Sequence, residues 1–478
     1  MSSQLKKELR GREFFTLAFG AMVGVGWIVV LGNWLDQAGP AGAILAFIAG
    51  GAVMLLVGLC YAEMGALFPV SGGEVAYAYE TFGLGTCFAT GWFLALSYIA
   101  TAVFEAVSVG WIADTLAPGI QGRALYISRG APVYFGSLLL ALIVLIAITF
   151  LNYLGIKPAA RLQNILTYAK IAFAVVVIGV GVGFGKAAHL EPLFRKGETG
   201  ILWTGVFGVF LTTLFWLSGF NTVAQLLEEK AEGTSLRMVG RMIVLAICAT
   251  TLFYCSVILA CAMTLPRSSL LKLDLPAATG FEVAFHSPML ARTVLLIALL
   301  GNITVLNAIF LAGTRVLFSL GRARIISHYF GKVDAVSRVP VFAVVFCGLL
   351  GCTGVFLGRS AILPMVNLTS SCFAFSYLLV CLGVIKMRRR KPELRSAYRI
   401  PCGQFTAGAG VLASLFILFL SLYEPYAAGG KRFPLEWVVL LVWAALGVLF
   451  WIGGQKIRKA LNEEQRRKTI LTAGVIAE

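Results

Sequence analysis

Repeated apolar runs of about 20 residues, each long enough to cross a bilayer as a helix, constrain this chain more than any other feature. Of its 478 residues, 59% are hydrophobic and only 13% are charged, which is not the composition of a soluble protein. The sequence therefore predicts an all-α polytopic membrane protein. Its expected transmembrane helices, about twelve in number, lie near residues 14–36, 41–67, 84–113, 133–152, 161–184, 203–227, 239–265, 292–318, 339–357, 361–385, 405–423 and 435–454.

The distribution of basic residues predicts the topology. Residues 1–12 are polar and basic and run directly into the first span, which lacks a small-residue cleavage site and is expected to be retained. If the N-terminus is inside, most of the 39 lysine and arginine residues fall on the cytoplasmic side. This asymmetry predicts an inner-membrane protein with both termini in the cytoplasm. The net charge of +17 then reflects topology and requires no nucleic acid.

Several functional classes lack support in the sequence. The ten cysteines form no CxxC pair and lie mostly in apolar runs, so neither a disulfide framework nor a zinc site is predicted. The three histidines are far apart, which gives no metal cluster and no metal cofactor. Nucleophile–base spacings and phosphate-binding loops are also not found, and we do not expect an enzyme.

The first span contains three glycines, Gly20, Gly24 and Gly26, within residues 19–28. Each weakens a helix interior by about 1 kcal/mol relative to alanine. Small residues at this spacing can simply allow close helix packing. Alternatively, they mark a break that exposes backbone N–H and C=O groups to a ligand at the membrane midplane.

The sixth span has a similar interruption at residues 215–222, where Ser218, Gly219 and Asn221 enter an apolar run. Alone, such a stretch can be a kink. It falls five spans after the first interruption, however, and paired breaks of this kind are typical of inverted-repeat transporters. We therefore predict a cytoplasmic N-terminus (1–13), a first repeat (14–184), a second repeat (203–387), two further packing or oligomer helices (405–454) and a cytoplasmic C-terminus (455–478).

Two ionisable residues lie deep in predicted spans. Glu105 is roughly 12 Å below the outer end of the third span, where a carboxylate must pair, take up a proton or face water. It is either a structural acid or a partner for a proton or a substrate amine. Lys170 is about 13 Å along the fifth span from Arg161, which is deep for snorkelling to the surface. A coupling or structural cation is the other interpretation.

With these motifs in view, the chain resembles bacterial permeases of the amino acid–polyamine–organocation superfamily over almost its whole length. The most specific match is YAEMGALFPVSGGE at residues 61–74. The first-span glycines, residues 167–170 and 314–322, and the basic loop ending at Pro401 also fit. The resemblance implies the leucine-transporter fold: a 5+5 inverted repeat with discontinuous helices 1 and 6, followed by two C-terminal helices.

The resemblance also implies roles for residues. Backbone N–H groups of Gly24, Val25 and Gly26 would bind a substrate carboxylate, as expected for a half-helix N-terminus. Carbonyls near Ala21, Met22, Phe215 and Ser218 would accept hydrogen bonds from the substrate ammonium. The further candidates at the substrate site are Trp27, Glu105, Gly219, Phe220, Asn221 and Asn307, with Phe215 and Phe220 as aromatic gates. Asn302 and Asn307 could equally bond neighbouring helices.

By the same resemblance, Lys170 matches a lysine of proton-coupled and exchanger members that stands where sodium-coupled relatives bind their ion. A fixed cation there disfavours sodium by charge repulsion, so proton coupling is favoured. Lys170 and Glu105 are therefore the predicted proton-coupling residues. Two departures from the family pattern matter. Asn221 replaces an acidic residue found in many members, and Trp27 replaces a small aliphatic residue. The outward loop at 114–132 has no cysteine for a disulfide link to a partner glycoprotein.

The sequence thus predicts a secondary active transporter for an amino acid or related amine that works by alternating access with proton-coupled symport. Its partners would be the substrate, protons and the lipid bilayer, and the protein would be a monomer or homodimer. An exchanger without net proton movement is the alternative within this class. A nutrient sensor that binds without transporting is the alternative from another class, although the cytoplasmic ends are short for one.

Overall fold

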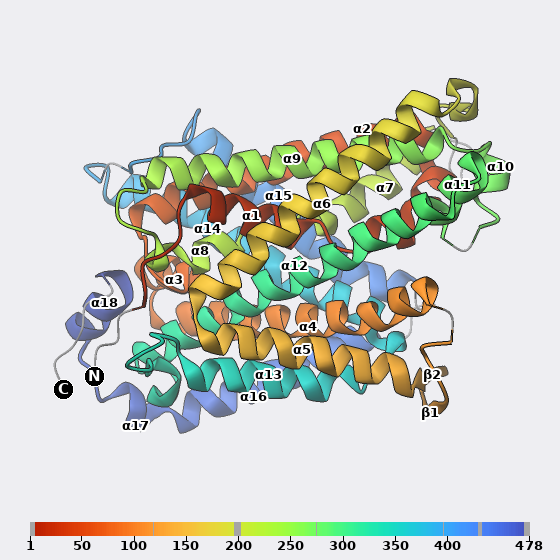
Figure 1. Ribbon diagram of the computed structural model, residues 1–478. Helices are drawn as coiled ribbons and strands as arrows, with labels where there is room; N and C mark the ends of the chain where they lie inside the picture. Colours follow the sequence, from red (N-terminus) through yellow and green to blue (C-terminus); the bar gives the residue numbers. More distant parts are fainter. Residues whose placement is uncertain are drawn as a thin grey trace.

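The computed structural model describes residues 5–117, 119–195, 202–273, 275–394, 396–428 and 433–472. Most of its helices run side by side along one long axis, with short helices and a hairpin at the two ends (Figure 1). The hairpin pairs β1 (Ala124–Ser128) with β2 (Ala131–Tyr134) in antiparallel register. The prediction of an all-α polytopic membrane protein is confirmed. Residues 1–4 and 473–478 of the predicted cytoplasmic ends lie outside the described residues.

The first span is broken where the glycines predicted. Helix α1 (Gly11–Met22) ends before α2 (Gly26–Leu67) begins. With 42 residues, α2 is about 63 Å long and too long for one crossing. Gly39, whose φ of 75° and ψ of 169° are not helical, kinks α2 just before Pro40. Glycine tolerates this conformation and proline lacks an N–H to donate, so the first two predicted spans meet at this kink.

The sixth span is broken in the same way. Helix α7 (Leu202–Trp216) is followed by a non-helical stretch at residues 217–221 and then by the short helix α8 (Thr222–Gln225). A 3₁₀ turn, η2 (Leu227–Glu229), continues to Lys230. Gly219 in the break has a φ of 127°, a conformation that residues with a side chain rarely adopt. The sixth span is therefore interrupted at Ser218 and Gly219 and is not a continuous helix with a kink.

The remaining helices follow the other predicted spans. They are α4 (Leu84–Leu116), α5 (Phe135–Leu154), α6 (Ile156–Phe184), α9 (Leu236–Ala262), α12 (Pro288–Arg322), α13 (Val341–Val355), α14 (Ile362–Arg390), α15 (Gln404–Ala428) and α16 (Leu435–Gly453). Within the described residues, nine helices are long and apolar enough to cross a membrane, and α7 and α13 are shorter apolar helices. The predicted spans are more numerous because α2 covers two of them and α7 and α13 supply two more.

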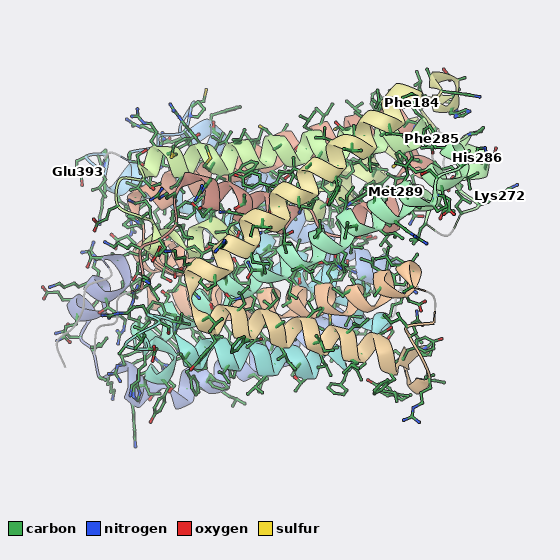
Figure 2. All side chains as sticks on the ribbon, in the orientation of Figure 1. Phe184, Lys272, Phe285, His286, Met289 and Glu393 are labelled. Atoms are coloured by element: carbon green, nitrogen blue, oxygen red, sulfur yellow. The ribbon has the colours of Figure 1, made fainter. Side chains whose placement is uncertain are left out.

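Short elements at the two ends were not predicted individually. One end holds α3 (Gly73–Phe82), η3 (His328–Gly331), α17 (Gln455–Arg458) and α18 (Glu463–Thr472). The opposite end holds the hairpin, η1 (Ala187–Leu190), α10 (Arg267–Leu270), α11 (Pro276–Phe285) and η4 (Arg359–Ala361). Figure 2 places Glu393 at the end with α3 and Lys272 at the other.

Burial separates an inner group of helices from an outer one. In the most apolar 18-residue window of α4 and of α12, 78% of the residues are buried, whereas in that of α16 only 6% are. The exposed side chains of α16 include Leu441, Leu449 and Phe450, which are apolar and suit contact with lipid. The broken helices pack against the inner group, so the breaks lie inside the protein.

Candidate functional site

The two helix breaks touch each other. A Cβ atom on Gly219 would lie 2.7 Å from the carbonyl oxygen of Ala21, so the second break can approach the first only with glycine at this position. A cavity of about 40 Å³ lies between the breaks. Its lining includes nine of the predicted residues: Ala21, Met22, Gly24, Val25, Gly26, Glu105, Phe215, Ser218 and Gly219.

The start of α2 offers unpaired backbone donors to this cavity. The first N–H groups of a helix have no partner inside the helix. Val25, the residue that caps α2, provides no side-chain hydrogen bond. Among the described residues, no hydrogen bond occupies the N–H groups of Gly24, Val25 or Gly26. Free donors at the positive end of a helix dipole are suited to an anion such as a carboxylate.

Lys170 holds the other side of the first break. Its Nζ donates hydrogen bonds to the carbonyl oxygen of Val23, at 2.8 Å, and to Oγ1 of Thr304, at 3.0 Å. The ammonium also lies 5.4 Å from the ring centroid of Phe19, and the side chain is fully buried. A cation here complements the negative end of the α1 dipole. This position is incompatible with the snorkelling interpretation, because the amine bonds inside the bundle.

Glu105 reaches the same break from α4. Its Oε1 lies 3.0 Å from the position that a Cβ on Gly24 would occupy, so glycine permits this close approach. Its Oε2 is buried and has no hydrogen-bond partner among the described residues. In the part of the chain that the structure describes, no ion pair joins Glu105 to Lys170. A buried carboxyl oxygen without a partner is unusual and marks a place where a donor, a cation or a proton can bind.

Several carbonyls of the breaks already accept hydrogen bonds. The carbonyl of Met22 accepts one from the hydroxyl of Tyr254 at 3.2 Å, and that of Phe215 accepts one from the N–H of Ser218 at 3.0 Å. A carbonyl oxygen has a second lone pair, so a bound ammonium can share these acceptors rather than find them empty.

Four of the predicted substrate-binding residues lie outside the cavity lining. The ring of Trp27 packs edge-on against Phe253, and Phe220 stacks on Tyr377. The amide of Asn221 donates to the hydroxyl of Tyr98 at 2.9 Å.

Asn307 is the fourth, and it bonds neighbouring helices instead. Its amide donates to Oε1 of Gln163 at 2.8 Å and to the carbonyl of Ala159 at 3.2 Å, both on α6. In this structure the side chain of Asn307 therefore bonds α6 and does not line the cavity.

Six lining residues were not predicted: Thr101, Trp216, Val305, Ile309, Thr369 and Phe373. Thr101 lies four residues before Glu105, Val305 four before Ile309 and Thr369 four before Phe373. Residues four apart share a helix face, so the prediction of Glu105 at the site could have suggested Thr101 as well. Nothing in the sequence indicated that the other two pairs face the cavity. Trp216 covers Gly26 so closely that a Cβ there would overlap its indole ring.

Buried ion pairs close the end of the bundle that holds α3. Arg315 forms a bidentate pair with Glu229, at 2.7 and 3.1 Å, and Arg322 forms one with Glu228, at 2.7 and 2.8 Å. These contacts tie η2, which follows the second break, to α12. Bidentate arginine–carboxylate pairs have strict geometry, so breaking them requires a discrete movement. We call the seam formed by α3, α8, η2 and the end of α12 the inner gate.

Comparisons with known proteins show the family of this chain. The model of the "Amino acid permease" family matches residues 12–446. The branched-chain amino acid permease BcaP of Bacillus subtilis is 28% identical over 96% of this chain and 95% of its own length. The methylthioribose transporter of the same organism is 26% identical over 97% and 96%. Cationic amino acid transporter 7 of Arabidopsis thaliana is 29% identical over 80% of this chain and 66% of its own. With nearly its whole length matched, the chain belongs to the amino acid permease family, a family of membrane transporters and not of enzymes.

Proposed function

We propose that this permease takes up an amino acid together with a proton by alternating access. One observation carries the proposal. The unpaired N–H groups at the start of α2, the buried ammonium of Lys170 and the unpartnered carboxyl of Glu105 converge on a single break beside a cavity. This combination can recognise a zwitterion and can also exchange a proton.

The substrate carboxylate would bind the N–H groups of Gly24, Val25 and Gly26. Its ammonium would share the carbonyls of the two breaks, near Ala21 and Ser218. The lining of the cavity also includes Val305, Ile309 and Phe373, which are apolar. An aliphatic side chain suits such a wall. We therefore favour a branched or similar aliphatic amino acid, which is in keeping with the name of the relative BcaP.

The closed cavity supports alternating access. At about 40 Å³ it has room for a few water molecules and not for an amino acid. Binding must therefore widen the space between the breaks, and release must open the inner gate. The half-helices before and after each break are the elements that can move with little loss of hydrogen bonding, because the breaks have already given up helical bonds.

Proton coupling would operate through Lys170 and Glu105. As an ammonium, Lys170 supplies three donors and a positive charge to the end of α1. As a neutral amine it loses one donor and the charge, which weakens its hold on Val23 and Thr304. Glu105, on the other side of the break, can receive a proton at its unpartnered oxygen. The charge state of these two residues thus affects the position of the break that binds substrate.

We infer the remaining architecture from the same features. The breaks fall in corresponding places of residues 14–184 and 203–387, which supports an inverted repeat with 405–454 added to it. The basic residues gathered at the α3 end support a cytoplasmic location for that end, with 1–13 and 455–478 on the same side.

Reconstituted vesicles test the proposal. An imposed pH gradient, acidic outside, should drive uptake of the substrate into vesicles that contain no internal substrate. If uptake occurs only when substrate is preloaded inside, the protein is an exchanger and net proton coupling is rejected. If labelled substrate binds but neither uptake nor exchange occurs, the protein is a sensor.

A cationic amino acid is the second candidate substrate. The partnerless Oε2 of Glu105 beside the cavity could balance a positive side chain, and one relative is named a cationic amino acid transporter. Competition against uptake of a labelled aliphatic amino acid distinguishes the two, because only a cationic site would be blocked by lysine or arginine at a similar concentration.

A further inference from the structure

A second buried carboxyl group, Glu74, lies outside the cavity and within the inner gate. It is the second residue of α3 and is 1% exposed. The hydroxyl of Tyr61 on α2 donates to its Oε1 at 3.0 Å, and the amide of Gln225 on α8 donates to its Oε2. Glu74 therefore connects α3 to the half-helix that follows the second break.

The hydrogen bonds continue from Glu74 back to that break. The amide of Gln225 also lies 3.3 Å from the hydroxyl of Tyr98 on α4. The same hydroxyl accepts a hydrogen bond from Asn221, the last residue of the break, at 2.9 Å. Asn221 itself cannot bind a proton in the physiological range. Glu74 is the carboxyl group at the other end of this series of hydrogen bonds. A movement of the break would be transmitted to Glu74 through Tyr98 and Gln225.

The contact between α3 and α8 is close enough to depend on glycine. A Cβ on Gly73 would lie 2.5 Å from the carbonyl oxygen of Ala224. The neighbouring N–H of Gly72 donates to the carbonyl of Gln225 at 3.2 Å. When α8 moves away from α3, these contacts and the hydrogen bond to Glu74 must separate together, and water reaches the carboxyl group.

The groups that face Glu74 provide no positive charge. Its titratable neighbours are tyrosines from four helices: Tyr61 on α2, Tyr77 on α3, Tyr98 on α4 and Tyr377 on α14. Among the described residues, no ion pair includes Glu74. An ionised carboxylate enclosed by neutral groups is costly, so the closed gate favours the protonated acid.

Several basic side chains on the helices packed against α3 have partners other than Glu74. On α12, Arg315 and Arg322 pair with Glu229 and Glu228. On α14, Arg388 pairs with Glu63 and Lys386 lies over the ring of Phe82, and Lys391, which follows α14, pairs with Glu80. On α18, Arg467 also pairs with Glu80 and Arg466 donates to backbone carbonyls. Glu80 and Phe82 are at the end of α3 remote from Glu74.

We propose that Glu74 is a proton-binding site of the inner gate, occupied while the gate is closed and emptied into the cytoplasm when α8 leaves α3. The proton moves from the carboxyl oxygen of Glu74 to water, and the carboxylate that remains is stabilised by hydration. This inference deepens the proposed function, since it assumes that the α3 end faces the cytoplasm. Burial also raises the pKa of Glu74 to about 7, which places the exchange in the physiological range.

Proton release from Glu74 determines in which direction pH shifts the inner gate. Release of the proton accompanies opening, so alkaline conditions on the α3 side favour the open gate and acidic conditions favour the closed gate. A neutral substitute that cannot release a proton keeps the gate closed at every pH. Glu80 provides a matched control on the same helix. Although burial favours its neutral form, hydrogen bonds from Arg467 and Lys391 lower the pKa of Glu80, so it stays ionised.

Hydrogen–deuterium exchange of the full-length protein in lipid nanodiscs tests the proposal. Peptides covering residues 68–82 and 219–235 report on the gate, and labelling times are scaled at each pH to correct for intrinsic exchange. In the unaltered protein, exchange of these peptides should rise several-fold between pH 6 and 8. Glu74→Gln should remove the rise and leave exchange low, whereas Glu80→Gln should keep the unaltered profile.

Tyr61→Phe provides a second, milder variant. It removes a donor that stabilises the carboxylate, so the midpoint of the rise should move to higher pH. An unchanged profile in Glu74→Gln, or uniformly high exchange in it, overturns the proposal. If Glu74→Gln does not fold, an unchanged midpoint in Tyr61→Phe overturns it. Because the measurement needs no transport, an intact exchange profile without pH-driven uptake would reject proton symport and leave the gate proposal standing.

Discussion

The amine of Lys170 on α6 donates a hydrogen bond to the carbonyl oxygen of Val23, 2.8 Å away, at the point where α1 has just ended. The bond fixes one side of the first break to α6, which is a continuous helix. It replaces a helical hydrogen bond that the break has given up, and it does so with a charge. We therefore propose that the protonation state of Lys170 affects the shape of the break.

Lys170→Ala should reduce pH-driven uptake at least tenfold, and any remaining transport should be insensitive to pH. The substitution removes both hydrogen bonds and leaves the end of the α1 dipole without a cation. Uptake measured in vesicles between pH 5.5 and 8 checks this. Arg161→Ala is the control, because Arg161 is exposed at the start of the same helix and should leave uptake unchanged. A Lys170→Ala protein with the original rate and pH profile would exclude the coupling role.

Gly219→Ala should abolish substrate binding and lower the free energy of unfolding by about 1–3 kcal/mol. Its φ of 127° is strained for alanine, and the new Cβ would meet the carbonyl oxygen of Ala21 at 2.7 Å. Thermal melting and ligand-induced shifts check both effects. Gly179→Ala, in the interior of α6 with open space around it, should be neutral or stabilising by up to about 1 kcal/mol. Equal effects of the two substitutions would mean that close contact of the breaks is unimportant.

Glu105→Gln separates the two substrate candidates. The amide keeps the size of the side chain but cannot balance a charge or bind a proton. If the substrate is cationic, uptake of cations should disappear while binding of neutral amino acids survives. If the substrate is aliphatic, binding should persist and dependence of uptake on the pH gradient should weaken. Binding and uptake measured on the same preparation decide between them, and a variant indistinguishable from the original protein would leave Glu105 a structural acid.

Glu74 should make the closed protein more stable in acid. Burial raises the pKa of Glu74 to about 7, so the folded closed state binds this proton more tightly than the unfolded chain does. The stabilisation that this bound proton gives the folded state is fully present below the ordinary pKa of a glutamate, 4.5, and is lost as the pH rises through about 7. This pKa shift corresponds to a change of at most about 3 kcal/mol in the free energy of unfolding.

Melting temperatures between pH 4.5 and 8.5 measure this dependence. Glu74→Gln should melt at a higher temperature than the unaltered protein at pH 8 and should lose most of the difference at pH 5. A difference that grows towards acid pH would contradict the sign of the expected effect.

The sequence predicted the breaks because three glycines in the first span, and Ser218, Gly219 and Asn221 in the sixth, interrupt long apolar runs, and both spans are broken there. It also predicted that Glu105 and Lys170 lie deep in their spans, and both side chains are buried in the structure. It could not orient side chains about the helix axis, so it left Asn307 open between lining the cavity and bonding a neighbouring helix, and the side chain bonds α6 in the structure. Phe220 and Asn221 lie in the break directly after Gly219, yet Phe220 stacks on Tyr377 and Asn221 bonds Tyr98, so neither lines the cavity. The network around Glu74 joins five helices and depends on tertiary packing that no local pattern reports.

Competition binding with an amino acid and its methyl ester tests the central claim most directly. The amino acid that gives the largest thermal shift in a screen would be compared with its ester and with the corresponding decarboxylated amine. If the N–H groups of Gly24, Val25 and Gly26 hold the carboxylate, both analogues should bind at least tenfold more weakly than the zwitterion. An ester that competes as well as the amino acid would show that the carboxylate is bound elsewhere, and the account of the helix break as the binding site would fail.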